Sequence, residues 1–340
     1  MIKLNKSNNP ISETELNSII DQNDMFLKIK SQLFNNKEKK NYDNFFKSLK
    51  QDYQGFYFRM FFLTITTIII ISLIGFFLQE SNVSIFKKTI FFLFASLVIG
   101  IFLYNIQQAV HLGQHFNLSK NRSVNDLITN FLGLFTGIEV TEGRRIHFKH
   151  HKLLSEDEDP ENSYMNRLNL KKIVKFFSLF AVFNYGLNVL FIKKKNDDDE
   201  VKLKDKIINF FSLYRFFSII FNLLILYVTY QINYIITLAW AYGLLAFCPF
   251  FCSLLNMLEH GNKKIDSKKN KILINRIFSN SILTKYLFLP FGADKHGIHH
   301  WDPKLHYSNL DDAEKFLSGT KLKMSIEQRQ ASFIETLRVI

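Results

Sequence analysis

Three long stretches without a charged side chain constrain the fold of this chain more than any other feature. They cover residues 60–79, 89–110 and 216–258. A helix needs about 20 apolar residues to cross the hydrocarbon core of a bilayer, which is ~30 Å thick. The third stretch is long enough for two crossings, and the polar residues Gln231 and Asn233 mark its turn. We therefore expect four spans, near residues 60–79, 89–110, 210–230 and 234–256, arranged as two helical hairpins.

Two shorter apolar segments, residues 127–138 and 176–192, do not fit this pattern as spans. The first is too short, and the second is borderline in length. If the polar segments on both sides of it face the same compartment, an even number of crossings must separate them, and the second hairpin already supplies two. We therefore expect both segments to lie in the membrane interface as interfacial helices.

This pattern predicts an all-α, multi-pass integral membrane protein with a cytosolic helical cap. We expect a membrane domain over residues 56–315, between a cytosolic N-terminal segment (1–55) and a cytosolic C-terminal tail (316–340). The connections near Ser81 and Asn233 are short and carry little charge. Positive charge is retained on the cytoplasmic side of membranes, so both termini are predicted to be cytoplasmic.

The formal net charge of +13 has a second interpretation, which is binding to nucleic acid. A nucleic-acid-binding domain would gather its lysines and arginines in a folded module beside aromatic side chains. Here the lysines flank apolar runs instead, as at Lys87, Lys88, Lys171 and Lys172. We therefore expect the membrane to be the partner and expect no nucleic acid.

The ten histidines are the main functional signal, because none lies in the first 110 residues and none in the middle of a span. They form the boxes HLGQH after the second span, HFKHH in the following polar segment, and HGIHH near the end of the membrane domain. One more follows the fourth span in NMLEHG. In order, these nine are His111, His115, His147, His150, His151, His260, His296, His299 and His300.

The spacing within the boxes favours two metal ions over one. Residues four apart share one face of a helix, so His111 and His115 can approach the same ion. In each HxxHH box the first and last histidines share a face, and the middle one can reach a neighbouring ion. A single zinc takes three or four protein ligands, which leaves too many histidines over. The tenth, His306, is expected to be a hydrogen-bonded or solvated side chain and is kept as an additional candidate ligand.

Acidic residues near the boxes are candidates to orient the ligands. A metal-bound imidazole usually donates its second N–H to a carboxylate or a carbonyl. Residues at suitable positions are Glu259, Asp157, Asp159 and Asp294. The alternative is that they belong to solvated acidic loops.

The three boxes resemble those of the integral-membrane fatty acid desaturase and hydroxylase superfamily in order, spacing and position relative to the spans. The resemblance covers roughly residues 60–310. The stretch HHKLLSEDEDPENS (150–163) is similar to the matching segment of acyl-CoA desaturases, which starts with HHK and ends with DPxNS. Asn256 and His260 resemble an additional pair in that group, in which the asparagine acts on a metal through water.

The sequence departs from the acyl-CoA desaturase pattern at two boxes. HLGQH has three intervening residues where that group generally has four, and HGIHH lacks the Asn-Tyr pair of HNYHH. The following WDPKLHYSNL looks more like bacterial acyl-lipid and carotenoid-type members. These departures leave the carrier of the substrate open between CoA, acyl carrier protein and glycerolipid. No HPGG haem-binding segment is present, so the resemblance implies a separate electron donor such as ferredoxin or cytochrome b5.

The resemblance implies that two Fe ions, held by the nine histidines with Asn256 acting through water, desaturate a lipid acyl chain with O₂. Side chains alone cannot oxidise an unactivated C–H bond, so the cofactor performs the difficult step. Three alternatives remain: a hydroxylase of a lipid, carotenoid or alkane on the same scaffold, a zinc-dependent membrane hydrolase, and a metal-handling protein. Chain length and the position oxidised are not determined by the sequence.

Overall fold

The computed structural model describes most of the chain, and nearly all regular structure in the described part is helical. The described residues are 36–79, 82–154, 156, 158–161, 168–179, 213–260, 275–278, 285, 288–320, 323–327 and 329–338.

In the described part of the chain, four helices are long and apolar enough to cross a membrane, which confirms the predicted all-α membrane protein. They are α4 (Gln54–Leu78), α5 (Ile85–Gln114), α11 (Leu213–Ile232) and a continuous run made of α12 (Tyr234–Tyr242), the π-helical turn η2 (Gly243–Phe247) and α13 (Cys248–Glu259). The second hairpin turns at Asn233, whose side chain caps α12 by accepting from the Ile235 amide.

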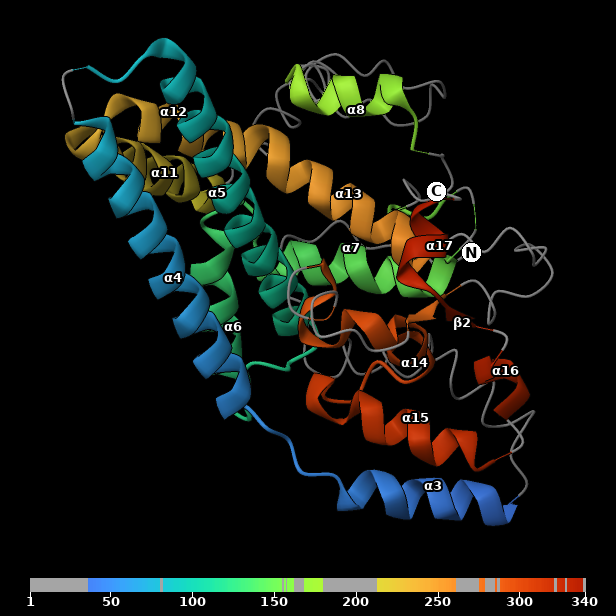
Figure 1. Cartoon of the computed structure of the whole chain (residues 1–340). Coiled ribbons are helices and arrows are strands. Elements are labelled where there is room, and N and C mark those ends of the chain that lie inside the picture. The colour runs from blue at the N-terminus through green and yellow to red at the C-terminus, as the bar shows by residue number, and fades with distance from the viewer. Residues whose placement is uncertain are drawn as a thin grey trace, which may run out of the picture.

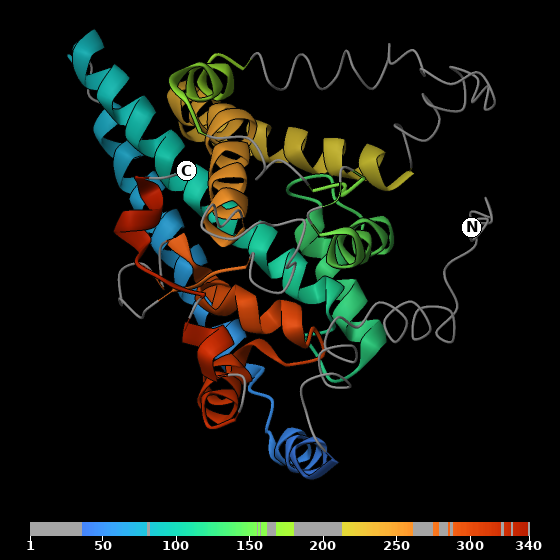
Figure 2. The ribbon, with the colours of Figure 1, turned by 90° about the vertical axis from the view of Figure 1, so that its right-hand side faces the viewer.

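Helix α5 is the central element of the structure and packs against α4, α6, α7, α12, η2 and α13. In Figure 2 it runs through the middle of the molecule, with the orange and red C-terminal elements on one side and the gold α11 on the other. The opposite faces of α4 and α11 expose apolar side chains such as Phe61, Phe62, Leu223 and Leu224, which suits contact with lipid.

Small residues allow α5 to approach the fourth span closely. Gly100 lies directly against the Phe247 side chain, and a Cβ at Gly243 would lie 2.8 Å from Cγ2 of Ile99. Close approach at glycine is a common way to pack helices in a membrane, where burial of apolar surface gives little drive for association.

The cap is built from shorter elements at one end of the spans (Figure 1). Its parts are α3 (Asn36–Ser48), α6 (Arg122–Gly133), α7 (Val140–Leu153), β1 (Ile277–Phe278), η5 (Pro290–Lys295), α14 (His296–Trp301), η6 (Tyr307–Asn309), α15 (Leu310–Ser318), α16 (Lys323–Glu327), β2 (Gln330–Ala331) and α17 (Phe333–Leu337). The strands β1 and β2 pair in parallel, with Ile277 opposite Gln330.

Parts of both terminal segments pack against the third histidine box. Tyr42 of α3 is buried and donates a hydrogen bond of 2.6 Å to Asp302, directly after α14. Ile326 and Arg329 are also buried, and Arg329 donates to the carbonyl of Gly297 inside the box. The division of the chain at residues 55 and 315 remains a prediction.

The two predicted interfacial segments are described to different extents. Helix α6 starts five residues before the predicted segment and exposes Val124, Leu127 and Phe131. Of residues 176–192, only the first four are described. Phe177, at the end of α8 (Leu170–Phe177), packs on Phe247 and Phe250 of the fourth span, and residues 180–192 lie outside the described part.

We expect Gly100→Ala to destabilise the bundle, because the added methyl meets the Phe247 side chain at the crossing of α5 and η2. Overpacking of this kind costs about 1–3 kcal/mol, and a lower midpoint of thermal unfolding in detergent would show it. Gly55→Ala is the matched control, because its methyl meets the exposed, flexible Asp52 carboxylate. Equal midpoints for the two variants would contradict the assignment of this crossing.

Candidate metal centre

Four helices end at one place and bring histidines with them. His111 lies in the last turn of α5 and His115 directly follows that helix. His150 and His151 lie in the last turn of α7, with His147 one turn earlier. His260 caps α13, and α14 consists mostly of the third box. The carbonyl end of a helix carries partial negative charge, which favours a cation nearby.

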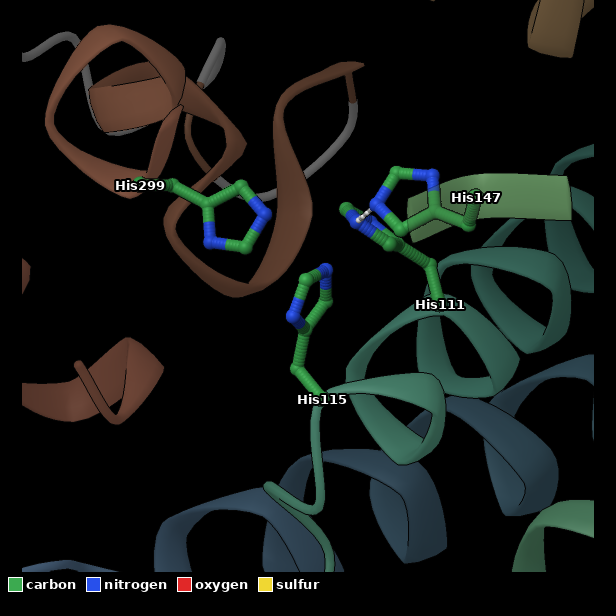
Figure 3. A group of neighbouring side chains, drawn as sticks. All are labelled: His111, His115, His147 and His299. Atoms are coloured by element: carbon green, nitrogen blue, oxygen red, sulfur yellow. Dashed lines mark hydrogen bonds between the residues drawn. The ribbon is translucent and has the colours of Figure 1, made fainter. Parts of the chain in front are cut away.

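The first group of histidines consists of His111, His115, His147 and His299. One ring nitrogen from each lies within 4.8 Å of those of the other three. Figure 3 shows the four rings pointing toward a common space, with the Nε2 atoms of His111 and His147 2.9 Å apart. This geometry suits a shared metal ion, because an ion would replace the short contacts between nitrogens by bonds to itself.

The second group consists of His150, His260, His296 and His300, and it meets the same distance criterion. The Nε2 atoms of His260 and His296 are 3.2 Å apart. All four side chains are buried. In each HxxHH box, the first and the middle histidine belong to different groups. This agrees with the two directions that the helical spacing predicts.

His151 lies between the two groups. Its Nε2 atom is 3.0 Å from Nε2 of His147 in the first group. Its ring stacks on His300 of the second group, with centroids 4.1 Å apart. The eight histidines of the three boxes and His260 therefore form one continuous cluster around two adjacent sites.

The buried nitrogens of this cluster fit a metal better than a hydrogen-bonded network. Among the described residues, neither ring nitrogen of His300 has a hydrogen-bond partner, and the Nε2 atoms of His115 and His299 have none either. Leaving a buried polar atom unpaired costs about 1–3 kcal/mol. Bound metal would satisfy these lone pairs and would explain why so many are gathered without donors.

Burial keeps these imidazoles in the neutral form that binds metal. It lowers the pKa of His299 to about 3. Burial is also the main cause, with neighbouring histidines second, of the lowered pKa values of His115, His151, His260, His296 and His300.

His150 differs, because an acidic partner holds its other nitrogen. Its Nδ1 atom lies 2.9 Å from Oδ1 of Asp159, which is buried as well. Burial lowers the pKa of His150, but the hydrogen bond to Asp159 and the charge of Glu161 outweigh it, so the pKa is raised. The carboxylate thus fixes which nitrogen of His150 faces the second group.

Three other histidines have comparable partners. Glu259 lies 3.2 Å from Nδ1 of His296, so both Asp159 and Glu259 contact histidines as expected. Two partners were missed by sequence reasoning. Glu161 lies 3.1 Å from Nδ1 of His147, and Asn275 lies 2.5 Å from Nδ1 of His260.

The two missed residues differ in how visible they are in the sequence. Glu161 belongs to the acidic run after the second box, only two residues beyond Asp159. Burial raises its pKa, but the charge of His147 and their hydrogen bond lower it to about 2. Asn275 lies in a polar stretch without a recognisable pattern, and only the tertiary structure brings it to His260.

The remaining sequence candidates lie in other surroundings. Asp294 is buried beside Lys295, and the described residues show no contact between it and a histidine. Asp157 lies outside the described residues. Asn256 donates to the Glu161 carbonyl, and its buried Oδ1 has no hydrogen-bond partner.

His306 has a structural environment apart from both groups. Its Nε2 atom donates to the Asn117 carbonyl at 3.0 Å, and its Nδ1 atom lies 2.8 Å from the Ser308 hydroxyl. The ring also meets Tyr53 edge-on. Both nitrogens are therefore occupied, as expected for a hydrogen-bonded histidine.

Comparison with known proteins agrees with this geometry. The family model described as "Fatty acid desaturase" matches residues 88–325, which is more than half of the chain. The chain belongs to the fatty acid desaturase family. No curated protein matches it significantly. Family membership, together with the histidine clusters, makes the chain an oxidoreductase of the desaturase and hydroxylase type, associated with membranes and lipid substrates.

This desaturase-family chain has a small open cavity, about 20 Å³ in volume, beside the histidine groups. His111, His296 and His299 line its inner end, and apolar side chains such as Leu112 and Leu305 line its walls. Phe291 and Gly292 form part of the wall with positive φ angles of 55° and 81°. A non-glycine residue in this conformation is strained. The strained residue, Phe291, lies in the cavity wall shortly before the third box.

We expect Asp159→Asn to weaken metal binding, because the amide cannot accept from His150 with the strength of a carboxylate. Loss of such a partner typically lowers metal affinity about 10–100-fold. Anaerobic titration of the metal-free protein with ferrous iron measures the change. Glu158→Gln is the control, since Glu158 is exposed. Wild-type affinity in Asp159→Asn would contradict this role.

Proposed function

We propose that the chain is a di-iron, O₂-dependent desaturase that introduces a double bond into a fatty acyl chain. The observation that carries the proposal is the pair of adjacent groups of four histidines, with buried nitrogens that have no hydrogen-bond partner. A single catalytic zinc would use three protein ligands. Two groups of four histidines suit a centre with two metal ions. Membership of the fatty acid desaturase family supports iron as the metal.

The protein itself would hold the metal ions, orient the histidines that bind them and shield the reacting carbon from water. His111, His115, His147 and His299 would hold one ion, and His150, His260, His296 and His300 the other, with His151 completing the set between them. Asn256 would act through water, for which its buried, unpaired Oδ1 is suited. The two irons supply the oxidation of an unactivated C–H bond with O₂. Asp159, Glu161 and Glu259 fix the orientation of their histidine partners.

We propose that the acyl chain reaches the histidines through the cavity beside His299, which must widen around it because its volume is only about 20 Å³. Its apolar wall excludes water from the reacting carbon, which protects the reaction from side reactions. The substrate is an acyl group carried by CoA, acyl carrier protein or a glycerolipid.

Electrons would come from a separate donor such as ferredoxin or cytochrome b5. We also propose that the metal centre and both termini face the cytoplasm, because the opposite connections, near Ser81 and Asn233, are short and carry little charge. This orientation would place the centre within reach of soluble donors.

Expression in a host followed by mass spectrometry of its lipids tests this function, with iron quantified in the purified protein. New double bonds are expected, and they remove two hydrogens, whereas hydroxylation adds one oxygen. New hydroxyl groups would assign the chain to the hydroxylases instead. Zinc in place of iron, with product formed without O₂, would overturn the proposal.

The histidine groups are tested by one substitution in each. We expect His299→Ala and His150→Ala to lose iron and activity together, because each removes a nitrogen from one of the two groups. His306→Gln is the matched control and should keep both irons, since His306 lies apart from the groups. An active variant without iron would contradict the proposed centre.

The cavity is tested by Leu305→Phe, which adds bulk to its wall. We expect oxidation of the longest accepted chain to fall about tenfold, the effect of ~1.4 kcal/mol in the transition state, while shorter chains are less affected. Leu317→Phe is the control, because Leu317 belongs to the same buried cluster without lining the cavity. Both variants should keep their iron. An unchanged chain-length profile in Leu305→Phe would place the acyl chain elsewhere.

A further inference from the structure

The two spans that bring histidines to the metal centre both stop there, at their carbonyl ends. The last four carbonyls of a helix have no partner within it and must find one elsewhere. Helices α5 and α13 end next to buried histidines, so water cannot freely donate hydrogen bonds to their last carbonyls. In each case a buried arginine from another part of the chain donates to two or more of these carbonyls.

Arg144 performs this task for α5. It lies on α7, one turn before His147, and is almost fully buried. Its Nε donates to the Gln114 carbonyl at 2.9 Å, and its Nη2 donates to the Gly113 carbonyl at 3.1 Å. Asp126 pairs with the same guanidinium at 2.6 Å. Arg144 therefore ties the helix of the second box to the carbonyl end that carries the first box.

Arg276 performs the same task for α13. It is buried, and its Nη1 lies 2.8, 2.6 and 2.6 Å from the carbonyls of Met257, Leu258 and His260. Its own amide donates to the Glu259 carbonyl. The preceding residue, Asn275, holds Nδ1 of His260. This short segment thus fixes both the backbone and the ring of His260.

We propose that Arg144 and Arg276 are positioning residues, each of which holds the ligands of one metal site. Arg144 holds His111 and His115 in the first group, and Arg276 holds His260 in the second. The inference rests on the proposed two-metal centre and adds that the two sites are supported separately.

The physical reason lies in the geometry of the guanidinium group. Its planar fork presents several donors at once and can bond neighbouring carbonyls in one orientation. Without the arginines, the Gln114 carbonyl of α5 and the Met257 and Leu258 carbonyls of α13 would lose these donors, and the last turns would rearrange to find others. The histidines on that turn would move with it, while the other group would keep its support.

The test measures how many ferrous ions the purified chain binds under anaerobic conditions, and how tightly. The variants are Arg144→Met and Arg276→Met, with Arg144→Lys and Arg276→Lys as milder changes in case the methionine variants fold poorly. Arg145→Met and Arg338→Met are the controls, because both residues are exposed arginines in the cap. Thermal unfolding of each protein checks that it is folded.

We expect the wild type and the controls to bind two ions. Each methionine variant should bind one ion with wild-type affinity and the other at least tenfold more weakly. The lysine variants should show the same selective weakening to a smaller degree. Adding His299→Ala to Arg144→Met should not remove the remaining ion, whereas adding His300→Ala should. For Arg276→Met the two histidine substitutions should have the opposite effects.

Two ions bound with wild-type affinity in all four arginine variants would overturn this inference and leave the proposed function intact. Equal weakening of both ions would overturn it as well, because it would indicate a general loss of structure. A wild-type chain that binds no iron would instead overturn the proposed function, and the inference with it.

Discussion

The structure depends on bringing many imidazole nitrogens into one buried space. Ring nitrogens as close as 2.9 Å share few hydrogens between them, and among the described residues several buried ones have no hydrogen-bond partner. A cation would bind these nitrogens, and the carbonyl ends of α5, α7 and α13 add a favourable field for positive charge. The fold is best understood as a set of helices that meet at two groups of histidines able to hold metal ions.

Several features of the cap follow from this constraint. Helices that end in a buried place need donors for their last carbonyls, and Arg144 and Arg276 supply them. The imidazoles need partners for their outer nitrogens, and Asp159, Glu161 and Asn275 supply those. These residues come from loops and from the polar segments between the spans, so the polar parts of the chain are as necessary to the centre as the boxes.

Much of the site could be predicted because its signals are local in sequence. A run of apolar residues predicts a span by its length, and HxxHH predicts two directions on a helix by its spacing. Asp159 and Glu259 could be predicted as partners of histidines because they lie near the histidines in the sequence. Asn275 was not, because no periodicity or motif marks it, and Asp294 contacts a lysine in place of the expected histidine. The position of residues 180–192 relative to a membrane remains a prediction.

The sequence by itself determined four spans, two hairpins and three histidine boxes outside the spans, since hydrophobic length and helical spacing act over a few turns. Only the tertiary structure decided which histidines share an ion, that His151 lies between the groups, and that His306 stands apart with Asn117 and Ser308. Those facts depend on how distant helices cross, and small residues such as Gly100 set that distance. The local sequence pattern therefore predicts the spans and the boxes, and packing between segments far apart in the chain decides how the histidines are grouped.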